Sequence, residues 1–208
     1  PLLQHLWSLG IEEQFYLVAP LAAVAVHRAW QRSRGRFRTA AILVAVGFIA
    51  ASLVASVLFT NPEYNAAFFL TPLRAWEFAV GGLIPLALPG VAWLPVRARS
   101  WLAPLGLALI LLATACFDAT TPYPALYAVV PVTGAAVVIA AGMADPNDRT
   151  ARVLSGGALV GLGLLSYGWY LWHWPLLVFG RLIFPEASPM PRDLAAVAIA
   201  LGIAFVTY

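Results

Sequence analysis

Hydrophobic residues gather in seven long segments, separated by short stretches rich in arginine, glycine and proline. Most of these segments approach the roughly 20 apolar residues that a helix needs to cross a bilayer. A helix in lipid satisfies its backbone polar groups internally, so the pattern predicts an all-α, polytopic bundle of transmembrane helices. The predicted segments cover residues 9–27, 39–60, 72–88, 101–117, 125–144, 157–184 and 194–208.

Two of the segments have unusual lengths. Residues 157–184 are too many for one straight span, so we expect a short interfacial turn before Ser166. The last segment has only 15 residues, and the chain begins at Pro1 without a recognisable signal peptide. We therefore expect residues 1–208 to form one transmembrane domain that is truncated at both ends.

Composition supports the membrane assignment. Of the 208 residues, 62% are hydrophobic and 10% are charged, and the mean hydropathy is +0.86. Soluble domains contain about 45–50% apolar and about 25% charged residues. These values exclude a soluble globule, a disordered chain and a nucleic-acid-binding protein. The single cysteine, Cys116, excludes a disulfide scaffold, and the three histidines are too far apart for a metal-binding motif.

Arginine is distributed unevenly between the two sides of the predicted bundle. Nine arginines fall in alternate loops: Arg28, Arg32, Arg34, Arg36, Arg38, Arg97, Arg99, Arg149 and Arg152. The positive-inside rule predicts that these loops are cytoplasmic and that residues 61–71 are extracytoplasmic. His27 adjoins the first arginine-rich loop, and we interpret it as a surface residue.

The first polar cluster lies at the start of the chain. On a helix, Ser8, Glu12 and Tyr16 share one face, whereas Glu13 points about 100° away from Glu12. Two interpretations stay open. The acids either cap a helix N-terminus, where negative charge is favourable, or belong to a polar site inside the bundle.

The second cluster contains Arg74 and Glu77, whose spacing predicts an ion pair. The pair either serves structure alone or holds a charged or hydroxylated ligand. Arginine cannot act as a base, but it suits a phosphate or carboxylate. Because Arg74 follows Pro72 near the outer end of its segment, we expect it to reach water and to pair only loosely.

The third cluster lies in the long sixth segment, where Ser166, Tyr170 and His173 fall on one helical face. Histidine is the commonest general base, and Trp172 and Trp174 flank this one. One interpretation is an aromatic belt with a hydrogen-bonded histidine. We favour a lined cavity, because the run lies too deep for a simple interfacial girdle.

Three motifs in these clusters carry a family resemblance: HLWSLGIEEQFYLVAPL, TPLRAWEFAVGG and LGLLSYGWYLWHWPLLV. In order and spacing they resemble the acyltransferase-3 family of bacterial integral-membrane O-acyltransferases, and the resemblance covers essentially the whole chain. It implies about ten spans in the complete protein. It also implies a catalytic histidine upstream of residue 1, so that residues 1–208 alone are expected to be inactive. Many relatives carry an extracytoplasmic C-terminal domain.

The resemblance further implies acyl transfer, most often of acetyl, from acyl-CoA to a hydroxyl of an envelope polysaccharide or other glycan. The expected location is the bacterial cytoplasmic membrane. Expected partners are the lipid bilayer, the glycan acceptor and acyl-CoA as donor substrate, with no bound cofactor, metal or nucleic acid.

By the same resemblance, the supporting catalytic candidates are Glu12, Glu13 and His173. Arg74 would contact phosphate or carboxylate groups, and Glu77 would fix it. The full set of substrate-binding or cavity-lining candidates is His5, Ser8, Tyr16, Arg74, Glu77, Ser166, Tyr167 and Tyr170.

Two other classes of protein fit polar residues inside a helix bundle. One is a proton-coupled transporter or flippase for an envelope precursor, which also uses intramembrane acids, arginine and histidine. The sequence lacks the internal repeats typical of such carriers. The other is a non-catalytic assembly subunit, in which the polar residues only hold helices together.

Overall fold

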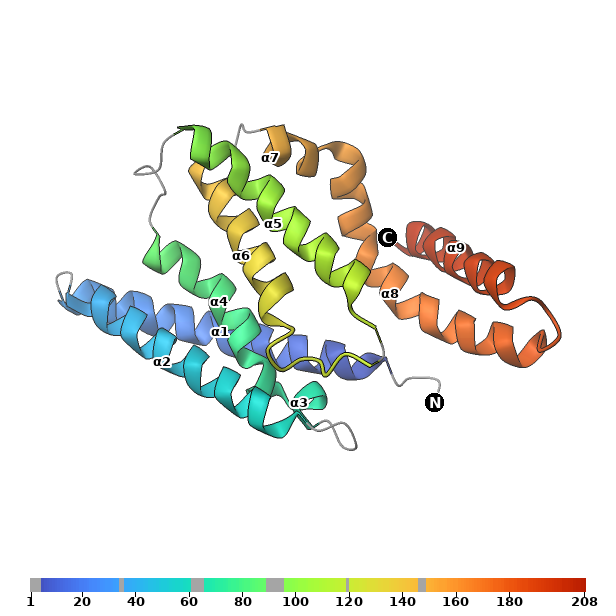
Figure 1. The fold of residues 1–208 in the computed structure, drawn as a ribbon, viewed down its shortest axis with the longest axis horizontal. Coiled ribbons are helices and arrows are strands. Elements are labelled where there is room, and N and C mark those ends of the chain that lie inside the picture. The colour runs from blue at the N-terminus through green and yellow to red at the C-terminus, as the bar shows by residue number, and fades with distance from the viewer. Residues whose placement is uncertain (1–4, 34–35, 61–65, 89–95, 119, 146–148) are drawn as a thin grey trace. The chain divides into compact units, whose positions relative to one another are not determined.

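A computed structural model describes residues 5–33, 36–60, 66–88, 96–118, 120–145 and 149–208 of the chain (Figure 1). The helices are α1 (Leu6–Ser33), α2 (Arg36–Phe59), α3 (Ala66–Phe69), α4 (Thr71–Ala87), α5 (Val96–Cys116), α6 (Val129–Ala144), α7 (Arg149–Leu154), α8 (Gly157–Ile183) and α9 (Pro189–Thr207). No strand occurs among these described residues, so the predicted all-α fold class is confirmed.

Each predicted apolar segment is helical over most of its length, and α3 and α7 are short helices between segments. The expected turn before Ser166 is wrong, because α8 continues unbroken through this position. The Ser166 hydroxyl donates to the carbonyl of Gly163 at 2.6 Å, a local bond that often accompanies helix bending. Figure 1 accordingly shows α8 as bent rather than interrupted.

Four of the described helical stretches are long and apolar enough to cross a membrane: Leu6–Arg32, Phe37–Phe59, Arg99–Cys116 and Pro189–Thr207. Helix α6 is apolar but shorter. Helix α8 has 27 residues but is not among these four stretches. The chain is a helical membrane protein, and the count of seven spans stays a prediction.

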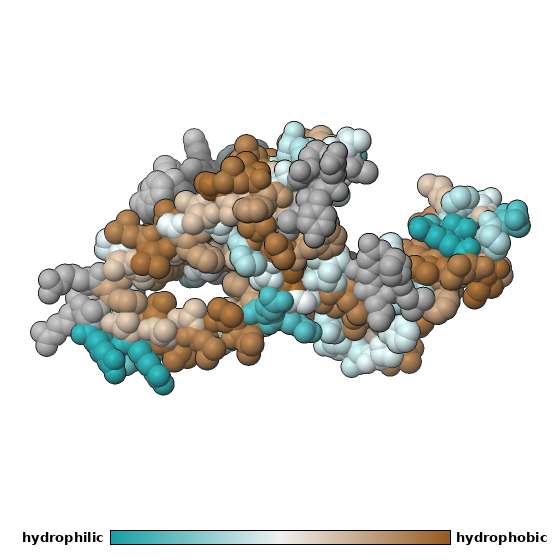
Figure 2. All heavy atoms as spheres, turned by 90° about the horizontal axis from the view of Figure 1, so that it is seen from below, coloured by the Kyte–Doolittle hydropathy of each residue, from teal (hydrophilic) through white to brown (hydrophobic). Residues whose placement is uncertain are grey.

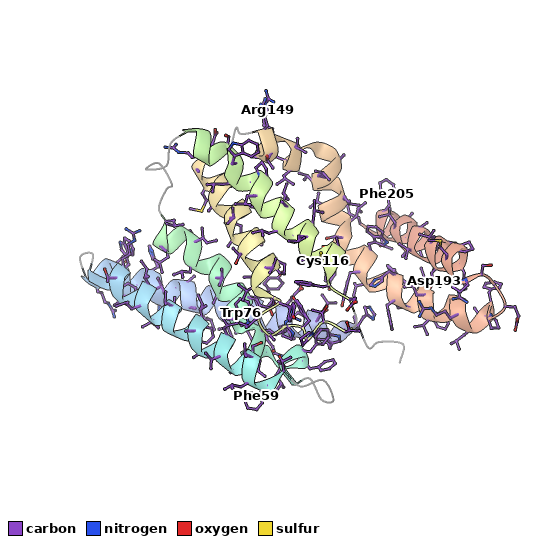
Figure 3. The ribbon with its side chains drawn as sticks, viewed as in Figure 1. Phe59, Trp76, Cys116, Arg149, Asp193 and Phe205 are labelled. Carbon is purple, nitrogen blue, oxygen red and sulfur yellow. The ribbon has the colours of Figure 1, made fainter. Side chains whose placement is uncertain are left out.

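Large apolar side chains cover the outside of the helices. Phe59 is 57% exposed and Phe205 is 71% exposed, and both point away from their helices (Figure 3). Hydrophobic residues also occupy much of the visible surface in Figure 2. Lipid tails are as apolar as these side chains, so burying them gives little drive for helix association. The helices must therefore associate through close packing and hydrogen bonds.

The chain forms two compact units. Unit 1 comprises Pro1–Gly10 and Val153–Tyr208, and unit 2 comprises Ile11–Arg152. Helix α1 contributes its first residues to unit 1 and the remainder to unit 2.

In unit 2, helices α5 and α6 pack closely at two facing glycines (Figure 1). A Cβ atom on Gly106 would lie 2.6 Å from the carbonyl oxygen of Gly134, and one on Gly134 would lie 2.7 Å from that of Gly106. Only glycine permits this approach, as in the small-residue contacts of other transmembrane helices.

A buried serine joins α2 to the first turn of α4, also in unit 2. The Ser52 hydroxyl donates to the carbonyl of Pro72 at 2.6 Å and accepts from the backbone N–H of Trp76 at 3.2 Å. It therefore bridges a carbonyl and an N–H that pair directly in a regular helix. This contact anchors the turn of α4 that carries Arg74.

Unit 1 is built on the packing of α9 against α8. Ala196, Ala200 and Ala204 form the buried stripe of α9, and the Ala204 methyl carbon would lie 3.2 Å from a Cβ atom on Gly168. The Trp169 indole N–H donates to the carbonyl of Val197 at 2.9 Å, which fixes the ring between the two helices.

Candidate functional site

The first polar cluster of the structure lies in unit 1 and joins the start of the chain to α8. The Tyr170 hydroxyl donates to the backbone carbonyl of His5 at 2.5 Å, and its oxygen lies 2.5 Å from the Ser8 hydroxyl oxygen. Ser8 also donates to the His5 carbonyl at 3.3 Å. The structure thus brings together candidates from the first and third sequence motifs.

His5 is buried within this cluster, with an exposed fraction of 9%. Its ring centroid lies 5.2 Å from that of Tyr170, 5.7 Å from that of His173 and 6.3 Å from that of Trp174. Neither ring nitrogen has a hydrogen-bond partner of normal geometry among the described residues. Burial lowers the pKa of His5, and the nearby His173 lowers it further, although the Leu171 carbonyl opposes both effects. His5 is therefore favoured as a neutral imidazole.

His173 is held by its own helix. Its Nδ1 lies 2.6 Å from the carbonyl oxygen of Tyr170. A carbonyl only accepts, so Nδ1 carries the hydrogen, and the neutral ring then has Nε2 as a lone-pair acceptor. This is the tautomer that a histidine needs to accept a proton or hydrogen bond through Nε2.

The predicted face of α8 lines a pocket. Ser166, Tyr170 and His173 line an open pocket of about 280 Å³, together with Trp169 and, from α9, Val197. These residues therefore share one pocket, and the interpretation of the motif as a lined cavity stays a prediction. Tyr167 is not among the lining residues of this pocket and is 58% exposed.

The second polar cluster lies in unit 2, where α4 carries the ion pair that the sequence spacing predicts. The Arg74 guanidinium donates from Nε to Glu77 Oε1 at 3.1 Å and from Nη2 to Oε2 at 2.9 Å. The two side chains are only 17% and 12% exposed. The expectation of a loose pair in contact with water is wrong, because the helix holds the two groups in a bidentate geometry.

Residues from outside α4 surround this pair. The Arg74 guanidinium carbon lies 5.9 Å from the ring centroid of Phe68, a cation–π distance. Burial raises the pKa of Tyr123, which lies in the loop before α6, and the Glu77 carboxylate adds to the rise. Tyr123 therefore stays a neutral phenol at physiological pH, where it can donate a hydrogen bond.

The acidic residues of the first motif lie on α1. Because this helix begins at Leu6, neither Glu12 nor Glu13 is in its first turn, and the capping interpretation is wrong. Glu12 is half-buried and close enough to Arg74 to act on its charge, whereas Glu13 is exposed. Tyr16 is 65% exposed, so the predicted face of Ser8, Glu12 and Tyr16 does not form one buried site.

Three contacts of unit 2 were not anticipated from the sequence. They are the Ser52 anchor, the ring of Phe68 beside Arg74, and the hydrogen bond from Thr71 to the side-chain oxygen of Gln14 at 2.8 Å. A serine inside a predicted span was the available signal for Ser52, since polar side chains in such helices seek partners. Nothing in the sequence pairs Gln14 with Thr71.

A large groove between α1, α2 and α4 in unit 2 has a volume of about 850 Å³. Small and aromatic side chains such as Ala19, Ala23, Phe48 and Ala79 line most of it.

His27, which was predicted to be a surface residue, is exposed and bonds Gln31 at 2.9 Å. Among the described residues, no group of three or more histidine, cysteine or acidic side chains is arranged to hold a metal ion.

Comparison with known proteins decides the family. The family model Acyl_transf_3, described as an acyltransferase domain, matches residues 1–208. The chain belongs to the acyltransferase-3 family. No solved structure matches this acyltransferase-3 chain.

Named bacterial relatives of this acyltransferase-3 chain are O-acetyltransferases. The putative peptidoglycan O-acetyltransferase YrhL of Bacillus subtilis is 28% identical over 90% of the chain and 30% of the relative. The peptidoglycan O-acetyltransferase OatA of Listeria monocytogenes is 27% identical over 99% and 34%. A putative O-acetyltransferase of Staphylococcus aureus (strain COL) is 26% identical over 98% and 34%. The chain therefore spans about a third of the length of the curated relatives it matches.

Proposed function

We propose that the protein containing this chain is an O-acyltransferase of the bacterial cytoplasmic membrane. It transfers an acyl group, most simply acetyl, from acyl-CoA to a hydroxyl of a cell-envelope glycan. The observation that carries the proposal is the match of the acyltransferase domain to all 208 residues. Two of the relatives described above are named for acetylation of peptidoglycan, which supports an envelope glycan as acceptor.

In this reaction, the hydroxyl oxygen attacks the carbonyl carbon of the thioester, the C–S bond breaks, and the hydroxyl proton passes to a base. Catalysis requires a positioned base and donors for the developing oxyanion. By the family resemblance, the base lies upstream of residue 1. The described residues supply polar groups that are fixed inside a helix bundle, which is the setting such a reaction needs.

The Arg74–Glu77 pair has the chemistry of an anion-binding group. A planar guanidinium suits the phosphate groups of acyl-CoA or a carboxylate of the acceptor better than a lysine does. Glu77 binds it through two nitrogens and so fixes its orientation. We assign Arg74 to ligand binding and Glu77 to positioning Arg74.

Deletion of the complete gene, with complementation, tests the proposal. We expect deletion to lower the base-labile acetate bound to the envelope glycan while the amount of glycan at the surface stays unchanged. Complementation with the full-length gene should restore the acetate. Loss of the glycan itself would instead indicate a transporter or flippase, and unchanged acetate in every envelope glycan would contradict the proposed transfer.

A further inference from the structure

The pocket between α8 and α9 in unit 1 has the dimensions of a small-ligand site. Its volume of about 280 Å³ lies just below the range for ligand pockets, roughly 300–1,000 Å³. Such a volume suits one ring of a ligand rather than an extended chain. Since both helices belong to the same compact unit, the pocket is formed within unit 1.

The polar atoms of this pocket are acceptors. His173 uses Nδ1 to donate to the Tyr170 carbonyl, which leaves Nε2 as an acceptor on the neutral ring. Ser166 uses its single hydroxyl hydrogen on the Gly163 carbonyl, so its oxygen lone pairs remain as acceptors. A ligand that pairs with these two side chains must therefore donate hydrogen bonds. Phosphates and carboxylates lack hydrogens to donate, whereas hydroxyl groups have them.

The remaining walls are aromatic. The Trp169 indole N–H is already bonded to Val197, so the ring offers an apolar surface that is fixed in orientation. Tyr170 is also fixed, because its hydroxyl donates to the His5 carbonyl. Aromatic walls with a few convergent polar groups are typical of small-molecule sites. This combination suits a sugar ring, which has an apolar face and a rim of hydroxyl groups.

His5 does not line the pocket, but it packs beside two of the residues that do. It is nine-tenths buried, its ring packs beside Tyr170 and His173, and neither nitrogen makes a hydrogen bond of normal geometry among the described residues, although the Leu171 carbonyl is near. Buried polar atoms in native proteins are nearly always paired with protein, water or ligand. A ligand hydroxyl that reaches His173 can also meet His5, because the two ring centroids are only 5.7 Å apart.

We propose that the pocket of Ser166, Trp169, Tyr170 and His173 binds a sugar ring of the acyl acceptor through its hydroxyl groups, with His5 as a further contact. The inference rests on the proposed transferase function and deepens it. It assigns the hydroxyl groups of the acceptor sugar to unit 1, in contrast to the charged Arg74–Glu77 pair of unit 2.

The substitution His173→Asn separates ligand binding from structure in the full-length protein. The asparagine amide can still donate to the Tyr170 carbonyl, but it has no group at the Nε2 position. We expect the KM for the glycan acceptor to rise about tenfold, equivalent to about 1.4 kcal/mol, while the KM for acyl-CoA stays unchanged. The matched control is His27→Asn, the same change at an exposed histidine of α1.

A wild-type KM for the acceptor in His173→Asn would overturn the inference and leave the transferase function standing. An inactive wild-type protein would instead contradict the proposed function, and this inference would fall with it. The two failures are thus distinguishable in one set of assays.

A labelling measurement does not depend on turnover or on the variant folding. Diethylpyrocarbonate modifies the lone-pair nitrogen of neutral imidazole rings, and peptide mass spectrometry reports the rate at each histidine. We expect the N-acetylglucosamine–N-acetylmuramic acid disaccharide to slow the modification of His173 but not of His27. Acetate ion, which has no hydrogen to donate, should not protect His173. Lack of protection by the disaccharide, or equal protection by acetate, would overturn the inference.

Discussion

The hydroxyl oxygens of Ser8 and Tyr170 lie 2.5 Å apart, although 162 positions separate the two residues in the sequence. Tyr170 also donates to the backbone carbonyl of His5, so one phenol ties the start of the chain to the middle of α8. This contact places the buried ring of His5 beside His173. Tyr170 is therefore the central residue of the polar cluster in unit 1.

The first prediction concerns this phenol. In the full-length protein, Tyr170→Phe removes the donor to His5 and leaves a partly buried carbonyl with one partner fewer. Because Ser8 still donates to this carbonyl, we expect a loss of about 0.5–1.5 kcal/mol in unfolding free energy, the typical net contribution of one hydrogen bond. Thermal unfolding in detergent measures it. Tyr127→Phe, at a 43% exposed tyrosine outside the cluster, is the control and should leave the midpoint unchanged. Equal midpoints for wild type and Tyr170→Phe would refute the structural role.

The second prediction concerns the Arg74–Glu77 pair. Breaking a buried pair by removing one partner typically costs about 3–5 kcal/mol, because the other charge is stranded. Both Arg74→Ala and Glu77→Ala should therefore lower the amount of folded protein in the membrane, and the double variant should recover part of it. Arg74→Lys should fold better than Arg74→Ala yet transfer poorly, since lysine lacks the planar fork.

An exposed pair in unit 1 provides the matched control. Arg181 bonds Asp193 at 2.8 Å, but the arginine is 52% exposed. Exposed pairs contribute little to stability because water and salt screen them, so Arg181→Ala should leave membrane abundance near the wild-type level. Similar losses in Arg181→Ala and Arg74→Ala would show that burial of the α4 pair has no special importance. Wild-type abundance and wild-type acylation in Arg74→Ala would defeat both the structural and the ligand-binding roles.

The third prediction concerns the crossing of α5 and α6. Gly106→Ala places a methyl group 2.6 Å from the Gly134 carbonyl oxygen, so the two helices must separate. Overpacking of this kind typically costs about 1–3 kcal/mol. Gly142, on α6, is the control position, because a Cβ atom there would have no atom within 4 Å. Gly142→Ala should be neutral or slightly stabilising, since alanine favours a helix. A thermal midpoint for Gly106→Ala equal to that of Gly142→Ala would show that this contact is not tight.

The fourth prediction is topological and follows from the distribution of arginine. A cysteine at Arg32 should be cytoplasmic, and one at Thr120 should be extracytoplasmic. Both positions are exposed in the structure. In a cysteine-free background of the full-length protein, which includes Cys116→Ser, an impermeant thiol reagent applied to intact cells should label only the cysteine at position 120. Labelling of the cysteine at position 32 alone would contradict this prediction and indicate the opposite orientation of the chain in the membrane.

The sequence predicted the helices well because each span must be apolar along its whole length in lipid. The turn predicted within residues 157–184 was wrong. A hydroxyl such as that of Ser166 can bond within its own helix and permit a bend without a break. Of the two interpretations left open for Glu12 and Glu13, capping fails, because the polar residues before the apolar segment are helical too. Apolarity alone does not reveal where a helix begins.

The candidate site was predictable only where its residues are neighbours on one helix. The Arg74–Glu77 pair and the face of Ser166, Tyr170 and His173 follow from helical spacing, and the structure forms both. The contact of His5 and Ser8 with Tyr170 depends on how distant segments pack, which helical spacing does not determine. The same holds for Tyr123 and Phe68 around Arg74.

Transfer by the purified full-length protein, reconstituted in lipid vesicles, tests the central claim most directly. Radiolabelled acetyl-CoA is supplied as donor and soluble peptidoglycan fragments as acceptor, and ester-linked label on the glycan is measured. The account predicts base-labile label on the glycan with wild-type protein, and its near-complete loss with Arg74→Ala at equal amounts of folded protein. Absence of labelled glycan with folded wild-type protein and both substrates present would contradict it.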